Sequence, residues 1–194
     1  TEPVDILDRD AFEKELNELG SLRAKADAIR TRLAKSINTK YQENPAYYEN
    51  FSKRIKEALE LYKARTITEA EYLAKMRDIL EDYRTGKSAI AYPNRIRANV
   101  HAQAFYGVLT AIFSNEKLSV EPDFAAEMAL DITTIIEKHS QVDWTHNLTI
   151  HDRISQDIDD LFYRYQKEMG LVLSFDVIDM IIENVKTVAL RRFA

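Results

Sequence analysis

The sequence predicts an all-α protein, an irregular bundle of about seven or eight helices. Only 4 glycines and 4 prolines occur among the 194 residues, and these two residue types most often interrupt helices. Apolar residues recur at spacings of three and four in one segment after another, as in a helix with one buried face. No segment alternates apolar and polar residues for long enough to indicate a strand, and long helices joined by short loops are typical of a bundle.

The first part of the chain predicts three helices. A short helix over residues 10–19 comes first. A long helix is expected to begin after Ser21, whose hydroxyl suits an N-cap, and to end at Asn44-Pro45. Its buried stripe is expected to comprise Leu22, Ala26, Ile29, Leu33, Ile37 and Tyr41. The stripe of the next helix comprises Tyr48, Phe51, Ile55, Leu59 and Tyr62.

A capping box marks the start of the fourth helix. Thr68 is followed three residues later by Glu71, so each side chain can accept a hydrogen bond from the other residue's amide. Gly86 is expected to end this helix, and residues 87–93 are the best candidate for an internal loop. The stripe comprises Tyr72, Met76, Ile79 and Tyr83.

Four more helices are expected after this loop. Pro122 suits the first turn of the second of them, where its missing N–H costs nothing. Thr149 and Asp152 flank the start of the third, and Ser174 caps the last. The four stripes are Ile96, Val100, Ala104, Val108 and Ile112; Phe124, Met128, Ile132 and Ile135; Ile150, Ile154, Ile158, Leu161 and Tyr165; and Ile178, Ile181, Val185 and Val188.

The composition predicts a cytoplasmic chain without disulfides. There are no cysteines, which excludes thiol catalysis and leaves zinc only His and carboxylate ligands. No run approaches the roughly 18 apolar residues that a membrane span needs, and no basic and apolar leader opens the chain. Because the chain begins at Thr1 and Pro3-Val4-Asp5 reads like a linker, we expect residues 1–9 to link from a preceding domain and residues 10–194 to form a single helical domain.

Two catalytic patterns begin in the sequence and are not completed. Thr85-Gly86-Lys87-Ser88 ends like a phosphate-binding loop, but the position that needs the first glycine holds Glu81, so we interpret the motif as a helix C-terminus. Pro122-Asp123 resembles the first half of a metal-dependent nuclease motif, and no Asp/Glu-x-Lys follows it. We therefore expect no catalytic residue and no bound cofactor in this chain.

A His-rich stretch runs from His139 through His146 to His151, close to Asp143 and Asp152. A metal site of His and carboxylate ligands is conceivable there. The spacings of seven and five do not place the histidines on one helical face, so we favour a surface loop over a metal site.

Basic residues concentrate in the middle of the chain. The candidates for contact with DNA phosphates are Lys53, Arg54, Lys56, Lys63, Arg65, Arg95 and Arg97. Glu49, Glu57 and Glu60 interleave with them, which favours intrahelical ion pairs on a solvated face. Residues 1–100 hold 19 Lys and Arg against 17 Asp and Glu, and residues 101–194 hold 8 against 15, so the chain lacks the overall basic charge of a nucleic-acid module.

Several blocks resemble the C-terminal helical region of the restriction (R, motor) subunit of type I restriction-modification enzymes. The longest is residues 47–62, which continues through 67–73. Others are residues 104–109, 142–144 and 154–161, and the closing helix that ends in Arg191-Arg192. The resemblance covers roughly residues 20–192 and consists of helix faces, so it transfers no catalytic residue.

The resemblance implies a role in assembly. In that family, other parts of the subunit cut DNA and translocate it with ATP and Mg²⁺, and the C-terminal region docks the motor onto the methyltransferase (M) subunit and the specificity core. The hypothesis is therefore a non-catalytic docking piece, with no membrane contact. The alternative is a module that contacts duplex DNA leaving the motor.

Three aromatic residues lie outside the periodic stripes and are candidates for partner binding. They are Tyr47, Tyr106 and Trp144. Tyrosine and tryptophan are over-represented among the residues that dominate protein interfaces. The alternative for Trp144 is that it plugs one end of the bundle, since tryptophan is highly buried on average.

Overall fold

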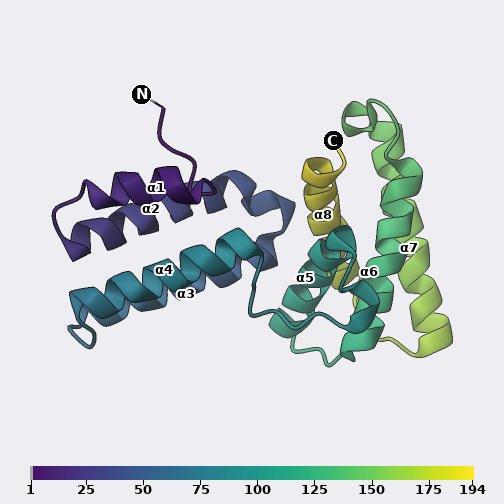
Figure 1. Ribbon diagram of the computed structural model, residues 1–194. Helices are drawn as coiled ribbons and strands as arrows, with labels where there is room; N and C mark the ends of the chain where they lie inside the picture. The colour runs from purple at the N-terminus through teal and green to yellow at the C-terminus, as the bar shows by residue number, and fades with distance from the viewer. Residues whose placement is uncertain (1) are drawn as a thin grey trace. The chain divides into compact units, whose positions relative to one another are not determined.

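The all-α prediction is confirmed. The structure is a computed structural model that describes residues 2–194, and within that range it contains eight α-helices, three short 3₁₀ turns and no β-strand (Figure 1). The chain divides into two compact units. Unit 1 comprises the described residues up to Tyr41 together with Tyr47–Ile90, and unit 2 comprises Gln42–Ala46 and Ala91–Ala194.

The helices of unit 1 begin and end close to the predicted residues. Ser21 caps α2 by accepting a hydrogen bond from the Ala24 amide. The capping box is present, with Thr68 Oγ1 accepting from the Glu71 amide and Glu71 accepting from the Thr68 amide. Gly86 ends its helix in the left-handed conformation. The bounds are α1 Arg9–Asn17, α2 Leu22–Lys40, α3 Pro45–Lys63 and α4 Glu69–Thr85, with the 3₁₀ turn η1 at Tyr41–Glu43.

Unit 1 has its own hydrophobic core, to which all four helices contribute; Leu22, predicted to belong to the buried stripe of α2, is 43% exposed and lies outside it. Its largest fully buried side chains are Phe12, Leu16, Ile29, Leu33, Ile37, Phe51, Tyr72 and Met76. Charge pairs join the helices at the rim of this core. The Arg32 guanidinium of α2 binds both Glu15 carboxylate oxygens of α1 at 2.7 and 2.8 Å. The short α1 is therefore held to its neighbours by ionic contacts as well as by apolar packing.

The segment before α1 packs on unit 1. Ile6 is buried, Arg84 donates to its carbonyl oxygen at 2.6 Å, and Arg32 donates to the carbonyl oxygen of Val4 at 3.0 Å. The assignment of residues 1–9 as a linker stays a prediction. The assignment of residues 10–194 as one domain also stays a prediction, because two compact units can unfold in a single cooperative transition.

Unit 2 contains the four remaining helices and two 3₁₀ turns. The first helix begins at Val100, not at Ile96 as its stripe suggested, because Asn99 caps it by accepting from the Ala102 amide at 2.9 Å. The third begins at Leu148 with Asn147 as N-cap. Pro122 and Ser174 start their helices as predicted. The bounds are η2 Asn94–Ile96, α5 Val100–Asn115, α6 Pro122–His139, η3 Trp144–His146, α7 Leu148–Met169 and α8 Phe175–Arg192.

Helix α5 is buried all round only in its central turns, since Val100 at its start, predicted to be buried, is 59% exposed and Ala111, Ser114 and Asn115 near its end are exposed. Every residue from Ala104 to Leu109 is buried, and α5 contacts α6, α8 and η2. A second apolar core, separate from that of unit 1, surrounds it. Because residues 98–115 carry no Lys, Arg, Asp or Glu, this helix can lose its solvent-facing side without burying a charge.

A short segment from between α2 and α3 completes unit 2. Gly107 of α5 approaches it so closely that an added Cβ would lie 2.7 Å from the Ala46 Cβ. Asn44 is buried beside this contact, and Arg192 donates to the Glu43 carbonyl oxygen at 2.9 Å. Gly107 is thus required by close approach and not by backbone conformation.

The end of α8 is fixed by polar contacts within unit 2. Arg192 Nε donates to His101 Nδ1 at 3.0 Å, and the Phe193 ring lies against the His101 ring with centroids 4.3 Å apart. Burial, followed by the charge of Arg192, lowers the pKa of His101. Neutral His101 is the form that accepts this hydrogen bond, so the contact favours the uncharged ring.

We predict that Gly107→Ala destabilises the protein by about 1–3 kcal/mol, since the added methyl group overpacks the contact with Ala46. Helix propensity alone would give the opposite sign, because alanine is favoured over glycine by about 1 kcal/mol. Urea unfolding followed by circular dichroism measures the change. Gly20→Ala is the control, since its added Cβ would meet no atom within 4 Å; equal midpoints for the two variants would contradict the prediction.

We predict that His101 makes the protein less stable in acid. Its folded-state pKa is lowered, so its contribution is complete above the unfolded value of about 6.5 and is lost as pH falls below it. His101→Asn keeps an acceptor but does not titrate in this range. The unfolding free energy of the wild type should therefore fall more steeply between about pH 7 and 5 than that of the variant, with the facing charges Arg192 and Glu137 unchanged in both. Parallel curves would contradict this role.

Candidate functional site

The phosphate-loop-like motif is a helix end. Gly86 has a φ of +73°, and the Lys87 amide donates to the Asp82 carbonyl oxygen at 2.8 Å, which closes the last turn of α4. Glu81 forms a two-hydrogen-bond ion pair with Arg9, and that pairing lowers the Glu81 pKa. The carboxylate therefore belongs to a structural pair that joins α1 to α4.

The His-rich stretch does not form a metal-ligand cluster within residues 2–194, where no group of three or more His, Cys, Asp or Glu side chains is placed to hold an ion. His139 lies in the last turn of α6, where its Nε2 is 2.6 Å from Asp157 of α7. His151 lies in α7 and its Nε2 is 3.1 Å from the Trp144 carbonyl oxygen. His139 and His151 therefore each have a structural partner.

Two of the three predicted partner-binding aromatics lie in the core of unit 2. Trp144 is 2% exposed, and its indole N–H donates to the Phe193 carbonyl oxygen at 2.8 Å. Tyr106 is 7% exposed, contacts the Tyr92 ring edge to face, and has a pKa raised by burial. These placements favour the alternative in which Trp144 plugs the end of the bundle, and a partner role for either residue gains no support.

Tyr47, the third aromatic, is half-buried at the start of α3. Its ring packs edge to face against Tyr48 and Phe51, with centroids 5.1 and 5.2 Å apart, and burial raises its pKa. Its role in partner binding stays a prediction. In the structure, Tyr47 forms part of an aromatic cluster at one end of unit 1.

Two of the three α3 lysines predicted to contact DNA lie near carboxylates of their own helix. Lys53 lies 3.9 Å from Glu57, and Lys56 lies 4.0 Å from Glu60, as the i, i+4 interpretation expected. Arg54 reaches α4 and pairs with Asp82 at 2.8 Å. Such pairs offset part of the attraction that these cations would exert on phosphates.

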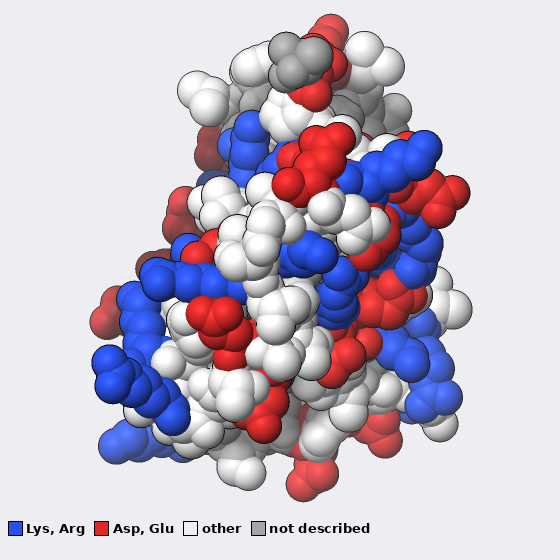
Figure 2. Space-filling view, turned by 60° about the vertical axis from the view of Figure 1, so that its left-hand side comes forward, with Lys and Arg blue, Asp and Glu red and all other residues white. Residues whose placement is uncertain are grey.

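The other four predicted DNA-contacting residues are divided between the two units. Lys63 and Arg65 end α3, where Arg65 adopts a left-handed φ of +58°. In unit 2, Arg95 lies 3.8 Å from Glu127, and Arg97 is exposed without an ion pair to a described residue. Figure 2 shows acidic and basic side chains interspersed over the face that it presents.

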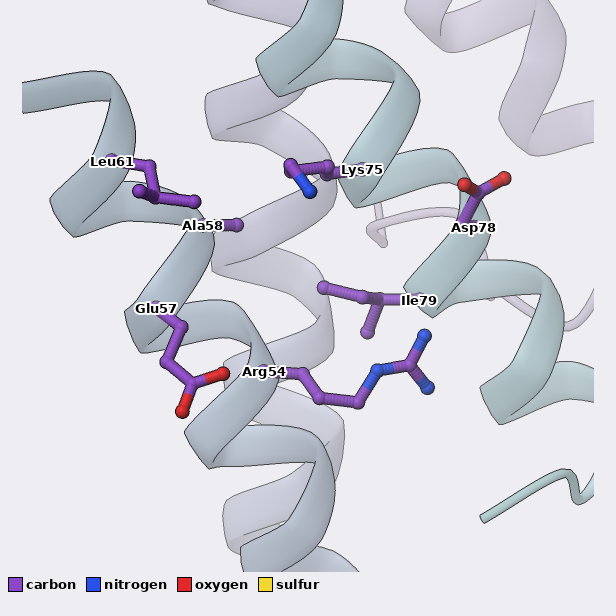
Figure 3. Close-up of a pocket in the computed structure, with 7 residues that line it drawn as sticks. All are labelled: Arg54, Glu57, Ala58, Leu61, Lys75, Asp78 and Ile79. Carbon is purple, nitrogen blue, oxygen red and sulfur yellow. The ribbon is translucent and has the colours of Figure 1, made fainter. Parts of the chain in front are cut away.

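A groove between α3 and α4 of unit 1 brings uncommitted charges and apolar surface together. It encloses about 230 Å³ and is lined by Arg54, Glu57, Ala58, Leu61, Lys75, Asp78 and Ile79. In Figure 3, Ala58 and Leu61 of α3 lie opposite Lys75 and Ile79 of α4, and Arg54 extends toward α4. Ala58 is small, so its position leaves room between the two helices.

The rim of this groove carries charges of both signs. Lys75 and Asp78 form no ion pair with any described residue, and Glu57 is paired only with exposed Lys53. The floor is apolar, with Ile79 buried and Leu61 36% exposed. Such a groove suits a protein segment that places an apolar side chain on the floor. An acidic side chain of that segment would pair with Lys75, and a basic one would pair with Asp78.

Sequence reasoning singled out Arg54 as a residue for DNA contact and did not predict the groove itself. Lys75 and Asp78 stand on another helix, and their apposition to α3 depends on how α3 and α4 pack. The available signal was Ala58, a small residue in a helix otherwise lined by large apolar residues. No helix in the part of the chain that the structure describes is long and apolar enough to cross a membrane.

Comparison with known proteins adds the family. Residues 1–189 match the family model described as "Type I restriction enzyme HindI endonuclease subunit-like, C-terminal". The chain is also 25% identical over 127 residues to the type I restriction enzyme HindI endonuclease subunit of Haemophilus influenzae. That match covers 66% of this chain and 12% of the relative, so the chain corresponds to a small part of its length. No solved structure matches the chain.

We predict that Trp144→Ala acts on stability. Removing this buried indole leaves a cavity and costs about 3–5 kcal/mol. Thermal unfolding should show the loss, whereas Leu61→Ala at the partly exposed groove should change the midpoint little. A Trp144→Ala variant with wild-type stability would contradict the core placement.

Proposed function

Because the chain belongs to the family of C-terminal domains of HindI-like type I restriction endonuclease subunits, we propose that it is a non-catalytic docking module. In this proposal it attaches the endonuclease and motor subunit to the methyltransferase–specificity core in the cytoplasm. DNA cleavage, ATP hydrolysis and Mg²⁺ binding belong to other parts of that subunit, and this chain needs no cofactor.

The observation that carries the proposal is the mixed charge around the α3–α4 groove. Lys75 and Asp78, which form no ion pair with a described residue, surround an apolar floor together with Arg54 and Glu57, which are paired with Asp82 and Lys53. A duplex presents negative charge along its whole length and would be repelled by the carboxylates while leaving the apolar floor unused. A protein side chain can cover the floor and pair with both signs.

The alternative is that the basic helices contact DNA directly. It would require cations that are free to release counterions from phosphates. The pairing of Lys53 with Glu57, Lys56 with Glu60 and Arg54 with Asp82 weakens it. Lys63, Arg65 and Arg97 are the residues on which a DNA role would mainly depend.

We predict that the purified chain binds the cognate methyltransferase–specificity complex and that Lys75→Glu weakens this binding at least about tenfold, or about 1.4 kcal/mol. The substitution reverses a charge that no described residue neutralises and that faces the groove. Surface plasmon resonance at two salt concentrations provides the measurement. Lys56→Glu is the matched control, since Lys56 is exposed on α3 outside the groove.

The same variants separate the two functions. Docking at the groove requires Lys56→Glu to bind the complex within about twofold of the wild type. Duplex DNA without the complex should bind weakly to all three proteins. Strong duplex binding that falls steeply with salt and is lost in a Lys63→Glu/Arg65→Glu variant would instead establish the DNA-contacting function.

A further inference from the structure

The turn between α7 and α8 exposes three large apolar side chains within seven residues. Met169 is 56% exposed, and Val172 and Phe175 are each 84% exposed. We call these three residues the α7–α8 tip. In Figure 1 the turn lies at the end of α8 opposite the C-terminus. Single exposed apolar residues are ordinary, but a group that includes a solvated phenylalanine marks an interaction surface.

The tip is held by a well-ordered turn. Gly170 takes a φ of +67° and its amide donates to the Tyr165 carbonyl oxygen, which ends α7. Leu173 is buried, and Gln166 Nε2 donates to its carbonyl oxygen at 2.9 Å. Because Leu173 points into the core, its neighbour Val172 must point outward.

The cap of α8 fixes Phe175 in the same way. Ser174 Oγ accepts from the Val177 amide at 3.3 Å, so Phe175 occupies the first position of the helix while Val177 and Ile178 turn inward. The exposed side chains are therefore pre-positioned, and binding through them requires little ordering of the chain.

Carboxylates surround the tip. Glu168, Asp176 and Asp179 lie within four residues of its members, and none forms an ion pair with a described residue. Lys167 is the nearby cation. A phosphate backbone or an anionic membrane would be repelled by this rim, whereas a protein pocket bordered by Lys and Arg would complement it.

We propose that the α7–α8 tip is a second protein contact, in which Phe175 and Val172 enter an apolar pocket bordered by Lys and Arg on the methyltransferase–specificity core. The identity of the partner rests on the proposed function. The surface itself lies on unit 2 and shares no residue with the α3–α4 groove.

The 194 residues contain no cysteine, so a label can be placed at one chosen position of this chain once cysteines elsewhere in the full-length subunit have been replaced by serine. Val172→Cys is labelled with an environment-sensitive fluorophore in the full-length subunit, and Thr187→Cys carries the control label. Thr187 is exposed on α8, about 18 Å along the helix from Phe175. Adding the methyltransferase–specificity complex should shift the emission at residue 172 to shorter wavelength and protect it from a soluble quencher, with no change at residue 187.

Substitutions give the affinity. Val172→Ser/Phe175→Ser should weaken binding of the complex at least about tenfold with unchanged helix content. Val142→Ser is the matched control, because it removes a valine that is 90% exposed beyond the opposite end of α7. It should bind within about twofold of the wild type.

Three results would overturn the inference. If the label at residue 172 already emits at the shorter wavelength and resists the quencher before the complex is added, another part of the subunit covers the tip. If the wild-type subunit binds the complex but the label at residue 172 does not respond, and the double variant keeps full affinity, the tip is not a contact. The docking function would then be unaffected. Failure of the wild-type chain to bind the complex would reject the docking function and, with it, the partner assigned to the tip.

Discussion

Burial of the central turns of helix α5 on all sides is the constraint on which unit 2 depends. Helical turns without a solvent face can carry no charge and must offer small side chains wherever a neighbour approaches closely. Gly107 meets this need against Ala46, and His101 at the start of the helix supplies a neutral acceptor for Arg192. The segment 42–46 and the end of α8 are thereby fixed by residues of one helix.

Unit 1 follows a different principle, since its helices keep one exposed face each and are joined by charge pairs at their edges. Those pairs engage four of the arginines of unit 1 with carboxylates of neighbouring helices. Arg32 binds Glu15, Arg77 binds Glu13, and Arg54 binds Asp82. What remains uncommitted at the α3–α4 groove, Lys75 and Asp78, is of both signs. The local electrostatics therefore favour a partner that itself carries both charges, which is a property of proteins and not of DNA.

The sequence predicted the helices well because caps and periodicity are local signals. Ser21, Thr68 with Glu71, Gly86, Pro122 and Ser174 act at the predicted positions. Two helix starts differ from the apolar pattern, and the reason is again local. Asn99 and Asn147 cap α5 and α7, so these helices begin at Val100 and Leu148. The separation into two cores was not foreseen, because every stripe has the same period whichever core it enters. For the same reason Trp144 and Tyr106 seemed free for a partner, although off-stripe residues of helical turns buried all round, or of a 3₁₀ turn, can still lie in the core.

The exposed residues of the α7–α8 turn show why off-stripe position alone is a poor guide to an interface. Tyr106 and Phe175 both lie outside the predicted stripes, yet one is buried against a neighbouring ring and the other is 84% exposed. The difference lies in what the adjacent residues do. Leu173 and Val177 supply the core contacts on either side of Phe175, so the fold has no further space for that ring. Gly170 and Ser174 fix the turn on which Phe175 stands, and the ring stays outside the core. It therefore contributes little to the stability of unit 2. This exposure is the observation on which the proposed contact at the tip depends.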